Sequence, residues 1–278
     1  MTEWREWTAA ETAAWIRVPT AGDDKYSRGV LGVLTGSAEY PGAAVLGVEG
    51  AARTGLGMIR YLGDAAAAQL VLQRRPEIVT GAGRVQAWLI GSGMDASTRS
   101  GALAGQLGDA LGQGLPTVLD AGALDLFAAA SGPVVLTPHF RELARLLSAQ
   151  GEKVSAEDIA DLPAHWAGTA ADRLGAVVLL KGSTTYIASP GREGIRVAAG
   201  PAWVATAGAG DVLGGVLGAL VASHSDRILQ SPDLLGEVAA AAAHLHGRAG
   251  DRASSGGPVV ALDIAEALPA TIAGLLAS

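Results

Sequence analysis

Residues 206–215 read Thr-Ala-Gly-Ala-Gly-Asp-Val-Leu-Gly-Gly and give the strongest signal in the 278-residue chain. Apolar residues at helical spacing follow and predict a buried helix over Asp211–Ala222: Val212, Leu213, Val216, Leu217, Leu220 and Val221. Glycines ahead of a helix let the chain turn sharply and bring backbone N–H groups close to a ligand. The amides of Gly208, Ala209 and Gly210, with the helix N-terminus, therefore predict an anion-binding site.

An acidic residue, Asp211, directly follows these glycines at the first turn of the predicted helix. The helix dipole is expected to keep its carboxylate ionised. Beside a substrate hydroxyl, the carboxylate is placed to accept the proton as the oxygen attacks a phosphoryl group. The same pattern also fits a plain glycine turn in which Asp211 only caps the helix, and the local sequence leaves both interpretations open.

Short β-rich runs alternate with long helical runs rich in Ala, Leu and Gly. The predicted strands are Val30–Thr35, Ala87–Ile90, Thr117–Asp120, Val134–Thr137 and Ala176–Lys181. The predicted helices, besides Asp211–Ala222, are Gly42–Arg60, Ala96–Leu111, Pro138–Leu147, Leu234–Gly250 and Asp263–Leu276. This alternation, with nearly continuous apolar strands, predicts an α/β fold with a mostly parallel sheet covered by helices on both faces. No linker or repeat divides the chain, so we expect one domain over residues 1–278, with a hairpin or loop at Gly191–Gly200.

The composition excludes several classes of protein. Hydrophobic residues make up 49% of the chain and charged residues 17%, which excludes global disorder. No apolar run reaches the roughly 20 residues that a bilayer span needs, and Met1–Trp7 lacks the apolar core of a signal peptide. The absence of cysteine fits a cytoplasmic protein. A net charge of −7 argues against nonspecific nucleic-acid binding.

Ligands of open parallel sheets bind beyond the carboxyl ends of the strands, so the residues that follow each strand carry most information. Lys181 follows five apolar residues, where its ammonium is within reach of a phosphate or, alternatively, extends into water at the sheet edge. Thr137 and Pro138 fit the N-cap and first position of a helix, which would aim His139 at the same edge. A purely structural histidine is the alternative there.

A Rossmann oxidoreductase is a competing interpretation. Gly91-Ser-Gly93-Met-Asp-Ala96 follows a strand and fits a loose dinucleotide fingerprint, with Asp120 at the end of a later strand. However, at least one strand–helix unit precedes this motif, whereas the usual fingerprint lies in the first. The oxidoreductase interpretation also leaves the Gly208–Asp211 and Lys181-Gly182 segments unexplained. No P-loop sequence is present, so a P-loop NTPase is excluded.

Taken in order, these motifs resemble the ribokinase-like fold, and within it the ADP-dependent NAD(P)H-hydrate dehydratase family. The segments that carry the resemblance are Lys25–Ala44, Ala52–Met58, Gly91-Ser-Gly93, Asp120-Ala-Gly-Ala-Leu, Thr137-Pro-His139, Lys181-Gly182 and Gly208-Ala-Gly-Asp211. The Gly-x-Gly-Asp motif is common to the whole superfamily of small-molecule kinases. The opening segment combined with Thr-Pro-His points to the dehydratase family.

The resemblance implies dehydration of the S form of hydrated NADH or NADPH, coupled to conversion of ADP to AMP and phosphate. It implies that Asp211 is the catalytic acid/base residue and that the hydrate contacts Ala43, Gly93, His139 and Asp211. The nucleotide, ADP or alternatively ATP, would contact Lys181, Gly182, Ser183, Thr184, Thr185 and Gly210. Mg²⁺ is expected to bridge the phosphates, although the sequence identifies no ligands for it. The resemblance also implies a homo-oligomer, such as the tetramer that relatives form.

Two segments depart from the family pattern. Gly122 stands where the family has a second acid, and Phe140 and Arg141 follow His139 where the family has Pro-Gly. The epimerase domain fused to many relatives is expected to be absent. Two other functions remain open: a ribokinase-like kinase for a vitamin or sugar hydroxyl, and a catalytically silent nucleotide-binding protein.

Overall fold

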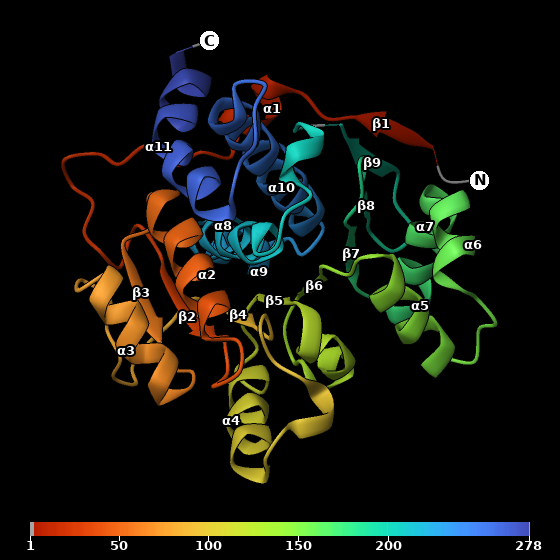
Figure 1. Ribbon diagram of the computed structural model, residues 1–278, viewed down its shortest axis with the longest axis horizontal. Helices are drawn as coiled ribbons and strands as arrows, with labels where there is room; N and C mark the ends of the chain where they lie inside the picture. Colours follow the sequence, from red (N-terminus) through yellow and green to blue (C-terminus); the bar gives the residue numbers. More distant parts are fainter. Residues whose placement is uncertain (1–2, 199, 278) are drawn as a thin grey trace.

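The computed structural model describes residues 3–198 and 200–277. Within these residues, nine strands form one sheet in the order β1-β9-β8-β7-β6-β5-β4-β2-β3 (Figure 1). The strands are β1 (Trp4–Glu6), β2 (Val30–Leu34), β3 (Met58–Tyr61), β4 (Ala87–Ile90), β5 (Thr117–Leu119), β6 (Val134–Leu136), β7 (Val177–Leu180), β8 (Thr185–Ala188) and β9 (Gly194–Val197). The five predicted strands correspond to β2 and β4–β7, each within one residue at either end.

The direction of the strands confirms the predicted mostly parallel sheet. Among the described strands, β8 alone runs against its neighbours, pairing antiparallel with both β7 and β9. The hairpin predicted at Gly191–Gly200 corresponds to the β8–β9 connection and β9, although residue 199 lies outside the described residues. The carboxyl ends of β2, β4, β5, β6 and β7 therefore meet along one side of the sheet, called the carboxyl edge below.

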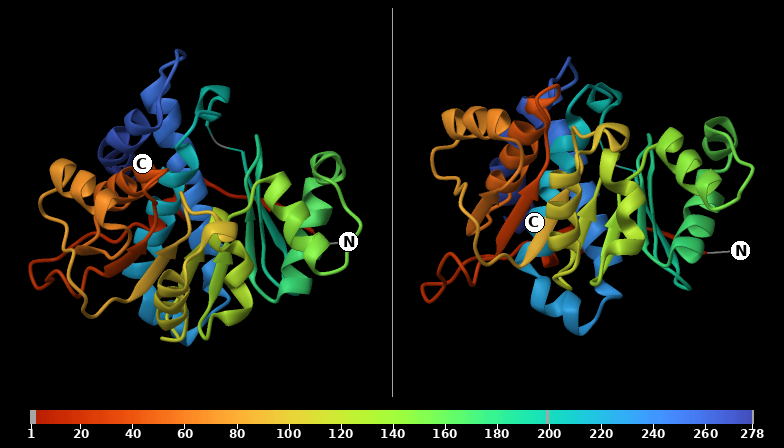
Figure 2. Two further views of the ribbon diagram at one scale, coloured as in Figure 1. Left: turned by 60° about the horizontal axis from the view of Figure 1, so that its bottom comes forward. Right: turned by 90° about the horizontal axis from the view of Figure 1, so that it is seen from below.

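Helices cover both faces of the sheet, as predicted. They are α1 (Ala9–Ala14), α2 (Pro41–Arg53), α3 (Ala65–Arg74), α4 (Gly101–Leu111), α5 (Phe140–Ala149), α6 (Ala156–Asp161), α7 (Pro163–Leu174), α8 (Ala209–Ser223), α9 (Ser225–Gln230), α10 (Leu234–Ser254) and α11 (Ala261–Ala277). Helices α2, α8, α10 and α11 share one apolar core, and α4, α5 and α7 share the other, on the opposite face (Figure 2). None of the helices described is long and apolar enough to cross a membrane.

The single helix predicted over Gly42–Arg60 is wrong, because α2 ends at Arg53 and the chain then enters β3. Two glycines explain the break. Gly55 has a φ of +97°, and a Cβ at Gly57 would lie 2.1 Å from the Lys25 carbonyl oxygen, so the chain turns sharply between the two elements. Strands β1 and β3 and helices α3, α6, α7 and α9 were not predicted.

The helix predicted over Ala96–Leu111 begins later than expected. A short 3-10 turn covers Ala96–Thr98, and α4 starts only at Gly101, where the Ser100 hydroxyl accepts a hydrogen bond from the Leu103 N–H at 3.2 Å. Ser100 is a typical N-cap residue. The segment that follows β4 is therefore a loop with its own turn.

Glycines bring helices α2 and α8 into backbone contact. A Cβ at Gly215 would lie 2.0 Å from the Gly47 carbonyl oxygen, and one at Gly50 would lie 2.5 Å from that of Val212. Since real side chains do not tolerate such distances, this packing requires glycine at both positions. The close approach fixes the first turn of α8 next to α2, and a Cβ at Gly47 would be only 3.6 Å from the Asp211 carbonyl oxygen.

Candidate active site

The residues that follow the parallel strands gather at the carboxyl edge, as the sequence predicted. Gly36 follows β2 and donates its N–H to the carbonyl of Ser92, which follows β4, at 2.7 Å. Lys181 follows β7 and donates its N–H to the Pro138 carbonyl at 2.9 Å. The glycine turn that opens α8 lies beside Lys181, since a Cβ at Gly210 would be 3.7 Å from the Lys181 Nζ. One site can therefore draw on side chains from several strands.

A buried carboxylate, that of Asp120 after β5, lies at the centre of this edge. It accepts hydrogen bonds from the Ser92 hydroxyl at 2.8 Å, the Thr137 hydroxyl at 2.7 Å and the Lys181 Nζ at 2.8 Å. Burial by itself raises the pKa of Asp120, but the Lys181 charge and these hydrogen bonds hold the pKa below its ordinary value. Asp120 is therefore ionised and paired.

The Lys181 ammonium is part of an ion pair in this structure. Its Nζ lies 2.8 Å from Asp120 Oδ1 and 3.9 Å from Glu142 Oε2, and its side chain is 21% exposed. Burial lowers the pKa of Lys181, but the charges of Asp120 and Glu142 outweigh it and raise the pKa above its ordinary value. The alternative interpretation, in which Lys181 extends into water at the sheet edge, is therefore not supported. The ammonium faces the glycine turn with its charge partly balanced.

The glycine turn has the geometry that an anion site needs. Gly208 is the N-cap of α8 in the left-handed conformation, with a φ of +87°. The N–H groups of Gly208, Gly210 and Asp211 donate to no acceptor in the described part of the chain, whereas Ala209 donates to the Thr206 carbonyl at 3.3 Å. Gly208 and Gly210 thus present open amides, meaning N–H groups without an acceptor in the described chain. Of the three predicted turn residues, Ala209 alone has its N–H group in a hydrogen bond there.

Asp211 lies at the first turn of α8, as predicted. Burial and, to a smaller extent, the charge of Asp120 raise the pKa of its carboxyl, while the Lys181 ammonium lowers it, and together they bring the pKa to about 6. The carboxylate is therefore still mostly ionised at pH 7, in agreement with the predicted charge. No described residue donates a hydrogen bond to the carboxylate, in contrast to Asp120. Asp211 therefore combines an unoccupied carboxylate with the proton affinity of a general base near neutral pH.

His139 has a different helical position from the one predicted. It is itself the N-cap of α5, and its Nδ1 accepts hydrogen bonds from the N–H groups of Arg141 at 3.1 Å and Glu142 at 3.3 Å. Thr137 is instead bonded to Asp120, so the predicted cap at Thr137 with Pro138 at the first helical position is wrong. The His139 side chain is 50% exposed, with its Nε2 3.5 Å from Glu142 Oε1. The ring has a structural role and still faces the carboxyl edge.

Ala43 and Gly93 meet on the β2–β4 side of this edge. A Cβ at Gly93, whose φ is +68°, would lie 2.5 Å from the Ala43 Cβ and 2.9 Å from the Tyr40 carbonyl oxygen. The loop after β4 therefore lies directly against the start of α2. A cavity of about 330 Å³ opens beside them, partly lined by Gly36, Ser37, Met94, Asp95, Arg99 and Ser100.

Residues Lys181–Thr185 form the tight connection from β7 to β8. Gly182 and Ser183 are exposed, Thr184 is half-buried, and Thr185 begins β8. A Cβ at Gly182 would lie 3.0 Å from the Phe140 ring, so Phe140 packs under this turn. The departure from the family pattern at Phe140 thus contributes packing to the proposed nucleotide-binding segment.

Gly122 also has a structural explanation. A Cβ at this position would lie 2.2 Å from the Met94 carbonyl oxygen, so no acidic side chain fits there. Its own carbonyl accepts a hydrogen bond from the Arg99 guanidinium at 2.6 Å, and Arg99 also pairs with Asp125 at 2.7 Å. Close packing between the loops that follow β4 and β5 therefore requires glycine.

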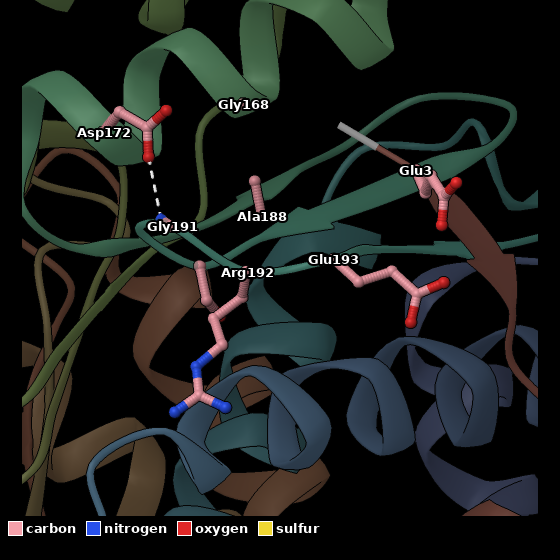
Figure 3. Close-up of a pocket in the computed structure, with 8 residues that line it drawn as sticks. Glu3, Gly168, Asp172, Ala188, Gly191, Arg192 and Glu193 are labelled. Atoms are coloured by element: carbon pink, nitrogen blue, oxygen red, sulfur yellow. Dashed lines mark hydrogen bonds between the residues drawn. The ribbon is translucent and has the colours of Figure 1, made fainter. Parts of the chain in front are cut away.

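A second cavity, of about 440 Å³, lies at the opposite edge of the sheet (Figure 3). It is formed by the β8–β9 turn, α7 and Glu3, and the Asp172 carboxylate accepts a hydrogen bond from the Gly191 N–H at 3.0 Å. The β8–β9 turn lies beside the amino end of β7, because β8 is antiparallel to β7. This cavity contains none of the predicted site residues. We therefore do not assign it as the active site, although its volume exceeds that of the 330 Å³ cavity at the carboxyl edge.

Sequence reasoning missed three contributors to the site. Asp120 and Ser92 were recognised only as strand-end residues or as part of a dinucleotide fingerprint. His246 on α10 was not assigned to the site, yet it is buried and lies near the Ala209 backbone, with its Nε2 lacking a hydrogen-bond partner in the described chain. Burial lowers the pKa of His246 to about 4, so this ring is neutral at pH 7. The strand-end rule could have identified Asp120, whereas nothing local marks His246.

Metal ligands and the oxidoreductase alternative can both be assessed from this geometry. No group of three or more His, Asp or Glu side chains in residues 3–198 and 200–277 is arranged to hold a metal ion.

The Rossmann interpretation is not supported, because a helix should open directly from the glycine motif. Here α4 begins only at Gly101, and the Asp120 carboxylate is occupied by three donors.

The fold and the site together define a class of α/β protein: a mostly parallel sheet covered by helices, with an acidic residue after a glycine turn at the carboxyl edge of the sheet. The family model described as NAD(P)H-hydrate dehydratase matches residues 31–270. The chain belongs to the NAD(P)H-hydrate dehydratase family.

Individual relatives agree with this assignment. The chain is 45% identical to the bifunctional NAD(P)H-hydrate repair enzyme Nnr of Mycobacterium tuberculosis over 229 residues, which cover 77% of this chain and 45% of the relative. It thus spans about half the length of the curated relatives of this kind. It is 34% identical to the ADP-dependent (S)-NAD(P)H-hydrate dehydratase of Neisseria meningitidis serogroup B, covering 80% of this chain and 76% of the relative.

A solved structure is also similar over the whole described chain. The ADP/ATP-dependent NAD(P)H-hydrate dehydratase of Bacillus subtilis, co-crystallised with ATP and Mg²⁺, has a TM-score of 0.83 at 26% identity. The match covers 99% of both chains. A ribokinase-like superfamily protein of Enterococcus faecalis has the same fold, with a TM-score of 0.79 at 23% identity. The ribokinase-like fold that the resemblance implied is therefore confirmed.

Proposed function

We propose that this chain dehydrates the S form of hydrated NADH or NADPH and restores the reduced nicotinamide, with ADP as the phosphoryl donor and AMP and phosphate as the other products. Family membership and the names of the relatives support this function. The observation that carries the proposal is the unoccupied Asp211 carboxylate, set between the Lys181 ammonium and the open amides of the glycine turn.

The proposed chemistry follows from what makes the hydrate stable. Hydroxide is a poor leaving group, so the ring hydroxyl is first phosphorylated. Asp211 takes the hydroxyl proton while the oxygen attacks the terminal phosphorus of ADP, and the bond from that phosphorus to AMP breaks. The ring nitrogen then donates its lone pair, the C–O bond breaks and phosphate leaves. Loss of a proton from the neighbouring ring carbon restores the double bond of the dihydropyridine.

The residues divide this work by their position along the carboxyl edge. On the β2–β4 side, Ala43 and Gly93 leave room for the hydrate beside Asp211, and His139 closes the pocket from α5. On the β7 side, the nucleotide lies along Lys181, Gly182, Ser183, Thr184, Thr185 and Gly210. The amides of Gly208 and Gly210 stabilise negative charge on the transferred phosphoryl group, an effect worth about 3 kcal/mol per donor in typical enzymes.

In the part of the chain that the structure describes, the site offers acidic side chains but no cluster of three arranged to hold a metal ion, and this suits Mg²⁺. Mg²⁺ usually retains several waters and binds mainly through substrate phosphates. We therefore propose that it is held by the nucleotide phosphates and neutralises their charge. We propose ATP as a second donor, since the Bacillus subtilis relative is named for both nucleotides. We further propose a homo-oligomeric, cytoplasmic enzyme.

The proposed function is tested by supplying the purified protein with the separate S and R hydrates of NADH, ADP and Mg²⁺. We expect the absorbance of reduced nicotinamide to rise with the S form only, with one AMP and one phosphate released per NADH. A stable phosphorylated alcohol without NADH would instead identify a kinase. No turnover of either hydrate, with nucleotide still bound, would indicate a silent nucleotide-binding protein and would contradict the proposal.

A further inference from the structure

The proposed reaction gives no step to Asp120, although this carboxylate is 4% exposed and lies at the centre of the site. Its three hydrogen-bond donors follow three other strands: Ser92 after β4, Thr137 after β6 and Lys181 after β7. The backbones of β4, β5 and β6 already pair along the sheet. The carboxylate is therefore not needed to join these strands, and its charge calls for a separate explanation.

The first consequence of this charge is the position of Lys181. The Lys181 Nζ is 2.8 Å from Asp120 Oδ1, and it lies beside Gly210, immediately before Asp211. Glu142 is a more distant partner, at 3.9 Å. Among the described residues, Asp120 is thus the acid nearest to the Lys181 ammonium, and no ion pair joins Lys181 to Asp211.

We propose that Asp120 is a positioning residue for the reaction proposed above: it anchors Lys181 beside the glycine turn and places a second negative charge near Asp211, so that Asp211 remains free to take the hydroxyl proton. This inference rests on the proposed function. Asp120 acts through Lys181 and through its field, and touches neither the hydrate nor the nucleotide.

The charges around Asp211 change its pKa in the direction that this role requires. The charge of Asp120 raises the pKa of Asp211 and that of Lys181 lowers it, while burial raises it most. Glu142 on α5 reaches this centre only through Lys181. From α10, the neutral ring of His246 lies near the backbone of Ala209, and His139, the N-cap of α5, is half-exposed and bonded within that cap. Asp120 and Lys181 are thus the two charges that set the proton affinity of Asp211.

Asp120→Asn tests this role, because it removes the charge and keeps the shape. In the wild type, the rate should fall with decreasing pH through about pH 6, as Asp211 becomes protonated. In the variant, we expect this acidic limb to move down by about one pH unit, the low end of the effect of a nearby charge. The kcat at the plateau should fall by less than tenfold, since a base weaker by one unit loses at most a factor of about ten in proton affinity. The KM for the hydrate should be unchanged.

Two further variants separate this role from a structural one. Thr137→Val removes one hydrogen bond to Asp120 and leaves every charge in place, so its acidic limb should coincide with that of the wild type. Lys181→Met removes the positive charge and retains Asp120, so protonation of Asp211 should move to higher pH. An Asn variant with an unmoved limb, or a Val variant that shifts as far as the Asn variant, would overturn the proposal.

A measurement without turnover distinguishes this inference from the proposed function. In protein with ¹³C-labelled aspartate carboxyls, the Asp211 signal is the one lost in Asp211→Asn, and its pH titration can be followed by NMR in each variant. If wild-type protein fails to dehydrate the hydrate, the function is refuted, and the NMR shifts still decide whether Asp120 and Lys181 act on Asp211. If Asp120→Asn does not fold, the opposite shift in Lys181→Met decides it: an unmoved titration there refutes the inference.

Discussion

Asp211→Asn is expected to lower kcat for dehydration by about 10²- to 10⁴-fold, the usual contribution of a positioned general acid or base. The amide matches the carboxylate in size but cannot accept the hydroxyl proton. Because no described residue donates a hydrogen bond to this side chain, the substitution breaks no interaction that holds the site together. The measurement is the initial rate of NADH formation at saturating ADP and hydrate. ADP binding, followed by calorimetry, should be retained.

The stability of the same variant provides an independent check. Burial raises the pKa of Asp211 to about 6, so the folded state binds this proton more tightly than the unfolded state does. Its ionised form therefore disfavours folding above about pH 6, and this penalty is absent below the ordinary aspartate pKa of about 4. Asp211→Asn should thus have a Tm equal to or above that of the wild type at pH 7. The exposed Asp226, mutated to Asn, is the matched control and should retain full activity. Activity of Asp211→Asn within tenfold of the wild type would contradict the assigned role.

Lys181→Met is expected to lower the free energy of unfolding by about 3 kcal/mol at pH 7, because it leaves the buried Asp120 carboxylate without its ionic partner. The Lys181 side chain is 21% exposed and that of Asp120 only 5%, so water cannot replace the lost ammonium fully. The affinity for ADP should fall as well, since the methionine carries no charge for a phosphate. Urea denaturation and calorimetric titration with ADP measure the two effects separately.

The double variant Asp120→Asn/Lys181→Met should recover most of that stability, because it removes both charges of the pair. Its affinity for ADP should remain low, which separates the structural role of Lys181 from its proposed binding role. Lys153→Met, at an exposed lysine, controls for the change of residue type and should alter neither property. Equal stability of the Lys181→Met variant and the wild type would show that the ion pair does not hold the site.

The sequence predicted the centre of the fold well, because buried parallel strands carry an unbroken apolar pattern. Strands β2 and β4–β7 were predicted on that basis. Strand β3 was missed because the predicted helix was carried through Gly55 and Gly57 to Arg60, whereas the break depends on the positive φ of Gly55 and on Gly57 packing against residues 25–28. Strand β1 was missed because it is an edge strand of three residues, none of them buried, and leaves little apolar signal.

The candidate site was predicted in its location but not in its electrostatics. The strand-end rule brought Gly93, Asp120, Lys181 and the glycine turn to one edge, and the structure confirms that they meet there. The raised pKa of Asp211 was not predicted, because it depends on burial and on Asp120, which is 91 positions away in the sequence. The cap of α5 was misplaced by two residues because an imidazole occupies it, and histidine is not among the preferred N-cap residues.

The claim that the ring hydroxyl is phosphorylated before it leaves can be tested by following its oxygen. The S hydrate labelled with ¹⁸O at the hydroxyl is incubated with the wild-type protein, ADP and Mg²⁺, and the inorganic phosphate is examined by mass spectrometry. We predict that each phosphate released carries one ¹⁸O atom, because the C–O bond breaks after the P–O bond has formed. Unlabelled phosphate, with the ¹⁸O recovered in water, would contradict phosphoryl transfer to the hydroxyl and with it the assigned role of Asp211.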